Sequence, residues 1–120
     1  MSKTILVAED SDSIRKFIIL ALKIAGFNVI PAVDGMDALE KMTGFDIDLL
    51  ITDLNMPNMD GFLLVETVRQ IEEFNNLPII ILSSLSNDED IKHGIESGAN
   101  SYLIKPFNEK RLLYEVSKFI

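Results

Sequence analysis

Residues 49–61 read LLITDLNMPNMDG, and the interpretation of the whole chain starts from this stretch. Its apolar beginning is typical of a buried strand, which ends at Asp53. Pro57 has no N–H and cannot continue a regular strand, and Asp60-Gly61 begins a helical pattern. Open α/β sheets keep their sites at the carboxyl ends of their strands, so Asp53 is a candidate functional residue. On this stretch alone, an aspartate that caps a turn is an equally good interpretation.

The composition is that of one globular domain. The chain has 120 residues, of which 48% are hydrophobic and 25% are charged. A chain of this size and composition buries a single hydrophobic core and needs no disulfides or metal ions to stabilise it. It contains no cysteine, which excludes disulfides, thiolate chemistry and cysteine-based zinc sites.

The charge balance narrows the function classes further. A formal net charge of −8 opposes nucleic-acid binding, which needs a basic surface, and favours a cation site wherever the acids converge. The N-terminal apolar segment is broken by Glu9 and Asp10 and is too short for a signal peptide. No apolar run approaches membrane-spanning length. We therefore expect a cytoplasmic monomer that neither inserts into a membrane nor binds nucleic acid.

Strand-like and helix-like segments alternate along the chain. We expect strands over residues 4–8, 27–30, 49–52, 79–82 and 101–104, with Pro31 ending the second of them. Helices are expected from Ser11 or Asp12 to Gly26, around residues 38–42, from Asp60 to Ile71, from Asn87 to Gly98 and over residues 109–119. This (βα)₅ alternation predicts an α/β fold with an open, doubly wound parallel sheet and helices on both faces. Five units are too few for a closed eight-stranded barrel.

Polar side chains follow four of these strands. In a parallel sheet the carboxyl ends of all strands share one edge, so we expect these residues to converge: Glu9, Asp10, Asp53, Ser83 and Lys105. Clustered carboxylates repel one another unless a cation neutralises them, and hard oxygen ligands suit Mg²⁺. A carboxylate is also a nucleophile that forms an aspartyl-phosphate, and a hydroxyl and an ammonium group stabilise the charge of a transferred phosphoryl group. The sequence thus predicts a Mg²⁺-assisted phosphoryl-acceptor site.

The chain resembles a response-regulator receiver domain of two-component signalling, of the CheY-like single-domain type. The matching motifs run along the whole chain: Glu9-Asp10, Asp53 with Met56-Pro57 and Met59-Asp60-Gly61, Ser83-Ser84, Gly98-Ala99 and Lys105-Pro106-Phe107. The resemblance implies a flavodoxin-like sheet with strand order 2-1-3-4-5. It also implies one receiver domain over residues 1–120, with no effector domain.

The resemblance assigns roles at the acidic site. Asp53 would accept a phosphoryl group from a phosphohistidine of a sensor histidine kinase or a histidine phosphotransferase. Asp10 and Asp53 would bind Mg²⁺ directly, together with the main-chain carbonyl of Asn55. Glu9, where the family more often has aspartate, would act largely through water.

The resemblance also assigns the response to phosphorylation. Lys105 would pair with the phosphoryl oxygens, and its bond to Pro106 would be cis. Ser83 would move to bind the phosphoryl group and Tyr102 would turn inward behind it, which would alter the surface of the fourth helix, fifth strand and fifth helix. Asn55 and Leu85 would flank the water that slowly hydrolyses the acyl phosphate.

The first helix has an unusually wide apolar arc. One interpretation is a deeply packed helix, and the other is a docking face in which Ile14, Phe17 and Leu20 contact the helical bundle of a kinase or phosphotransferase. On a helical wheel the remaining positions are Arg15, Lys16, Ile19 and Lys23.

Other functions remain open on the sequence. A phosphatase of the haloacid-dehalogenase kind needs a second acid two residues after its nucleophile, where this chain has Asn55. A flavodoxin-like cofactor binder needs a phosphate-binding loop after the first strand, where residues 9–12 are mostly acidic. A receiver fragment of a longer regulator is a further alternative. For a single-domain protein in chemotaxis, motility or a phosphorelay, the output would come from binding a motor component, a kinase or an enzyme.

Overall fold

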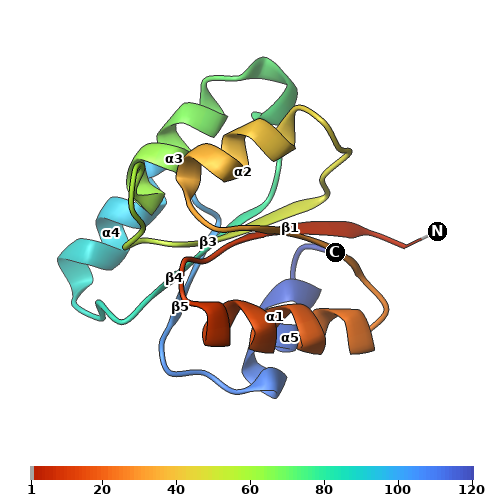
Figure 1. The fold of residues 1–120 in the computed structure, drawn as a ribbon. Coiled ribbons are helices and arrows are strands. Elements are labelled where there is room, and N and C mark those ends of the chain that lie inside the picture. Colours follow the sequence, from red (N-terminus) through yellow and green to blue (C-terminus); the bar gives the residue numbers. More distant parts are fainter. Residues whose placement is uncertain (1) are drawn as a thin grey trace.

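A five-stranded parallel sheet forms the centre of the computed structural model, which describes residues 2–120 (Figure 1). The strand order is β2-β1-β3-β4-β5, which confirms the predicted fold class and topology. The strands are β1 (Thr4–Ala8), β2 (Asn28–Ala32), β3 (Leu49–Asp53), β4 (Ile79–Ser83) and β5 (Ser101–Ile104). The helices are α1 (Asp12–Ile24), α2 (Gly35–Met42), α3 (Gly61–Arg69), the 3₁₀ helix η1 (Glu72–Phe74), α4 (Asp88–Ser97) and α5 (Glu109–Ser117).

Both faces of the sheet are covered. Figure 1 shows α1 and α5 on one side of the sheet and α2, α3 and α4 on the other. Every residue of β3 and β4 is buried, and successive side chains enter opposite core clusters, as Leu50 and Ile51 do. This two-sided burial explains why the central strands are continuous apolar runs rather than alternating ones. Among residues 2–120, no helix has both the length and the hydropathy to cross a membrane.

The predicted end of the second strand is wrong. Pro31 lies inside β2, in register with Val7 of β1. Because β2 is an edge strand, one of its sides has no partner strand, and a proline without an N–H is tolerated there.

Four further element ends also differ from the sequence prediction. β3 and β4 each extend one residue further, to Asp53 and Ser83, so these two site residues still have strand geometry. In the other direction, α3 ends at Arg69, before Ile71, and α5 ends at Ser117, before Phe119. Differences of one or two residues are usual where helix ends fray into turns.

Each α-helix begins at a side-chain cap. The five capping residues each accept a hydrogen bond from a backbone N–H three positions further on: Ser11, Asp34, Asp60, Asn87 and Asn108. Such caps satisfy N–H groups that have no partner within the helix. They fix where each helix starts, and so fix the short loops at the carboxyl edge of the sheet.

Glu115 fastens α5 to β5 although it is a carboxylate with only 5% of its surface exposed. It accepts a hydrogen bond from Ser101 Oγ at 2.7 Å and pairs with Lys118 Nζ at 3.0 Å. Burial by itself raises the pKa of Glu115, but these bonds and the charges of Lys118 and Arg111 outweigh burial and hold the pKa below its usual value. The ionised form of Glu115 is therefore favoured by the folded state.

Glu115→Gln is expected to lower the free energy of unfolding at pH 7, and to lose that effect in acid. A carboxyl group whose pKa is lower in the folded state contributes stability above its unfolded pKa, and this contribution disappears as the pH falls through the folded pKa. Urea unfolding at pH 7 and at about pH 3 checks this, with the exposed Glu66→Gln as the control. A deficit that stayed the same at both pH values would contradict it.

Candidate functional site

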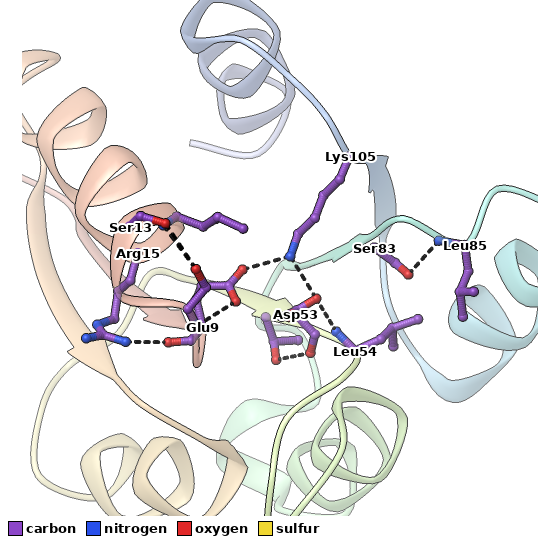
Figure 2. Close-up of polar contacts among 11 residues, drawn as sticks. Glu9, Ser13, Arg15, Asp53, Leu54, Ser83, Leu85 and Lys105 are labelled. Carbon is purple, nitrogen blue, oxygen red and sulfur yellow. Dashed lines mark hydrogen bonds and ion pairs between the residues drawn. The ribbon is translucent and has the colours of Figure 1, made fainter.

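The carboxyl edge of the sheet brings together three acids and one ammonium group. Figure 2 shows Lys105 between two of these acids, Glu9 and Asp53. Carboxylate oxygens of Glu9, Asp10 and Asp53 all lie within 4.8 Å of one another. Lys105 Nζ lies 2.9 Å from Glu9 Oε1 and 3.1 Å from Asp53 Oδ1. The four residues come from the ends of β1, β3 and β5, and the structure places them together as the sequence predicted.

The cluster carries unbalanced negative charge. Glu9 has none of its surface exposed, and burial raises its pKa to about 7, with Asp53 acting in the same direction and the bond from Lys105 opposing both. Burial lowers the pKa of Lys105, but its bonds and charge interactions with Glu9 and Asp53 outweigh this and leave the pKa raised. One ammonium group therefore faces three acids, an arrangement that favours a further cation.

Asp53 has one oxygen engaged and one open. Oδ1 accepts the N–H of Leu54 at 2.9 Å and pairs with Lys105. Within residues 2–120, Oδ2 has no hydrogen-bond partner, and Asp53 keeps 6% of its surface exposed. The side chain is thus held in one orientation while one carboxylate oxygen remains available for attack.

Gly61 sets the backbone beneath Asp53, a role that the sequence interpretation missed. Its N–H donates to the Leu54 carbonyl at 2.9 Å. A Cβ at position 61 would lie 2.9 Å from Leu54 Cα and would clash with the carbonyl oxygen of Asp53. The available signal was a glycine at the first position of the helix that follows β3, where close backbone approach excludes any side chain.

The two candidate switch residues are joined through Leu85. Ser83 is buried, and its Oγ accepts the N–H of Leu85 at 3.0 Å, while Tyr102 Oη donates to the Leu85 carbonyl at 2.8 Å. The Tyr102 ring packs against Gly94 of α4, where an added Cβ would lie 3.0 Å from Tyr102 Cδ2. A displacement of Ser83 therefore has a direct physical route, through Leu85 and Tyr102, to α4.

Asn55, the other candidate ligand, is exposed in the loop between β3 and α3. The same loop contains Asn58 in the left-handed conformation (φ 70°). Asn58 Nδ2 donates to Asp34 Oδ2 at 2.7 Å, which ties the loop to the start of α2.

The candidate docking residues form an exposed apolar stripe on α1. Phe17 is 41% exposed and Leu20 is 60% exposed, while Ile14 is half-buried. Ile24, which the sequence interpretation did not include, extends the stripe with 71% of its surface exposed. At the N-terminal end of α1 the stripe borders a cavity of about 250 Å³. The cavity is lined by Ser13, Ile14, Phe17, Lys105, Pro106 and Phe107.

This cavity joins the stripe to the acidic site, because Lys105 contributes to both. The Phe17 and Phe107 rings lie 6.3 Å apart, centroid to centroid, and the Lys105–Pro106 bond is cis as expected. A partner helix on α1 would therefore lie directly beside the acid cluster.

Comparison with known proteins identifies the family. A family model described as the response regulator receiver domain matches residues 5–117. The chain belongs to this family. The receiver fold matches that of the Vibrio cholerae chemotaxis protein CheY4 with a TM-score of 0.96 at 35% identity, covering 100% of both chains.

Other known proteins resemble the chain over nearly its whole length. It is 34% identical over 119 residues to the transcriptional regulatory protein PrrA of Mycobacterium tuberculosis, covering 99% of this chain and 50% of PrrA. It thus spans about half the length of such curated relatives. The receiver domain of the sensor histidine kinase PA1611 of Pseudomonas aeruginosa has a TM-score of 0.91 at 26% identity, with 99% and 98% coverage, and its structure contains a magnesium ion in the active-site cleft.

Proposed function

We propose that the chain is a phosphoacceptor response regulator in which Asp53 receives a phosphoryl group from a phosphohistidine of a sensor histidine kinase or histidine phosphotransferase. The observation that carries the proposal is the Asp53 carboxylate, held through Oδ1 with Oδ2 open, beside two further acids and Lys105. Oδ2 attacks phosphorus, the phosphorus–nitrogen bond breaks, and the histidine nitrogen keeps the electron pair. The Lys105 ammonium stabilises charge on the phosphoryl oxygens during transfer.

The acidic cluster fits a divalent cation. Its donors are carboxylate oxygens, which Mg²⁺ prefers, and they converge within 4.8 Å. Asp10 and Asp53 would hold the ion with the main-chain carbonyl of Asn55, and Glu9 would contact it through water. When bound, Mg²⁺ neutralises negative charge around the transferred phosphoryl group. The magnesium ion in the PA1611 receiver domain supports the same chemistry here.

Phosphorylation would act on partner binding through Ser83 and Tyr102. Ser83 would bind the phosphoryl group and release Leu85, and Tyr102 would then move relative to Gly94. The surface that changes is formed by α4, β5 and α5, where exposed apolar side chains are Ile95, Ile104 and Tyr114. Its target would be a protein, such as a motor component, a kinase or an enzyme, in chemotaxis, motility or a phosphorelay.

A second candidate is a receiver fragment of a longer regulator. The observation in its favour is that curated relatives named as transcriptional regulators are about twice as long as the chain. Binding of the protein to purified candidate partners, compared with and without beryllofluoride as a phosphoryl mimic, would identify the output.

Phe17→Ser is expected to slow phosphotransfer from a kinase about tenfold while leaving phosphorylation by acetyl phosphate nearly unchanged. The small donor does not need a docking surface, whereas the helical bundle of a kinase would pack on Phe17 and Leu20. Rates with both donors check this, with Leu63→Ser on α3 as a matched exposed apolar control. Equal slowing with both donors would remove the docking role.

Incubation with acetyl phosphate and Mg²⁺ tests the proposed function against its alternatives. We expect a mass increase of about 80 Da that maps to Asp53 and decays slowly after the donor is removed. Continuous release of phosphate from phosphate esters would instead support a phosphatase. The absence of any adduct would contradict the phosphoacceptor function.

A further inference from the structure

Arg15 lies at the end of the first turn of α1, and its side chain turns back to the end of β1 (Figure 2). A helical wheel places it among the solvent-side residues, but its side chain is only 14% exposed. One guanidinium nitrogen donates to the main-chain carbonyl of Glu9 at 2.8 Å, and the other pairs with Asp12.

The main chain of Glu9 is held at both of its polar groups. Its N–H donates to the Ala32 carbonyl of β2 at 3.1 Å, and its carbonyl accepts from Arg15. The bond to Ala32 holds the peptide unit before Glu9, and the bond from Arg15 holds the one that joins Glu9 to Asp10. Within residues 2–120, the exposed Asp10 carboxylate has no hydrogen bond to hold it, so its direction depends on this peptide unit.

Arg15 forms no bond to the three converging carboxylates and so does not occupy the oxygens that a cation would bind. Its bonds go to a carbonyl and to Asp12, neither of which is one of the three converging carboxylates. A cation in the first turn opposes the helix dipole, so local helix preference does not account for an arginine here. A planar guanidinium group, unlike an ammonium group, donates to two fixed acceptors in one plane at once.

We propose that Arg15 is a positioning residue for the cation site. By holding the Glu9 carbonyl, Arg15 fixes the peptide unit from which the Asp10 carboxylate extends toward Glu9 and Asp53. The inference rests on the proposed function, in which Asp10 and Asp53 hold Mg²⁺. Residues that orient metal ligands in this way contribute strongly to metal affinity although they never touch the ion.

Titration of the metal-free protein with MgCl₂, followed by backbone amide NMR shifts, tests the role of Arg15. We expect Arg15→Met to weaken Mg²⁺ binding about tenfold. Arg15→Lys keeps the charge but has a single donor nitrogen in place of the guanidinium group. It should weaken Mg²⁺ binding about threefold. Lys16→Met removes the same charge from the exposed neighbouring position and should change the dissociation constant by less than about twofold.

Thermal unfolding of the same proteins in EDTA separates positioning from folding. A purely structural Arg15 would lower the melting temperature and leave the Mg²⁺ dissociation constant of the folded protein unchanged, which would overturn the proposal. Equal weakening by Arg15→Met and Lys16→Met would also overturn it. If Arg15→Met does not fold, Arg15→Lys decides, because affinity equal to that of the wild type would contradict the proposal.

The wild-type titration distinguishes failure of the proposed cation site from failure of the proposed role of Arg15. Wild-type protein that shows no Mg²⁺-dependent shifts would overturn the proposed cation site, and the role of Arg15 with it. Wild-type binding that Arg15→Met leaves unchanged would overturn the role of Arg15 alone.

Discussion

Lys105→Met is expected to slow phosphorylation of Asp53 by acetyl phosphate about 100-fold at saturating Mg²⁺. Lys105 Nζ lies 3.1 Å from Asp53 Oδ1 and 2.9 Å from Glu9 Oε1, so its ammonium group lies beside the developing charge. Methionine keeps much of the length of the side chain and removes the charge and the donors. Saturating Mg²⁺ ensures that a change in metal affinity does not contribute to the measured rate.

Lys110→Met provides the matched control for this measurement, since Lys110 is an exposed residue of α5. It should leave the rate within about twofold of the wild type, because a distant surface charge is screened. A Lys105→Met rate within the same range would show that Lys105 stabilises no charge during transfer.

Gly61→Ala is expected to lower the free energy of unfolding by about 3 kcal/mol. The added Cβ would meet main-chain atoms, 2.9 Å from Leu54 Cα and against the carbonyl oxygen of Asp53, which cannot move aside as a flexible side chain could. Relief requires α3 to shift away from β3, and that shift would also displace Asp53. Urea unfolding measures the change in stability, and phosphorylation by acetyl phosphate measures the displacement.

Gly44→Ala is the control for the glycine prediction. A Cβ at position 44 meets only the Lys41 carbonyl oxygen, at an ordinary 3.9 Å, so stability should change by less than about 1 kcal/mol. Equal effects of the two substitutions would mean that the close approach at Gly61 is not what constrains α3.

The fold and the acid cluster could be predicted from the sequence because they follow from one-dimensional patterns. Apolar runs alternating with helical periodicity imply a parallel sheet, and parallel strands bring the residues after them to one edge. Asp53 and Lys105 lie far apart in the chain but converge for this reason alone. The strand order was implied by the family resemblance, because hydrophobic periodicity does not determine the order of strands in a sheet.

The remaining features depend on tertiary placement that no local pattern encodes. Pro31 is compatible with β2 only because β2 is an edge strand. A helical wheel places Arg15 on the solvent side of α1. The wheel takes no account of the direction of the side chain, which points back toward the N-terminus of the helix and reaches the end of β1. The need for glycine at position 61 likewise arises from how closely α3 approaches the end of β3.

The most direct test of the central proposal is intact-protein mass spectrometry of wild type and Asp53→Ala after incubation with acetyl phosphate and Mg²⁺. The account predicts that the wild type gains one phosphoryl group and that Asp53→Ala gains none, because the open Oδ2 of Asp53 is the nucleophile. Uptake by Asp53→Ala to the same extent as by the wild type would contradict the account.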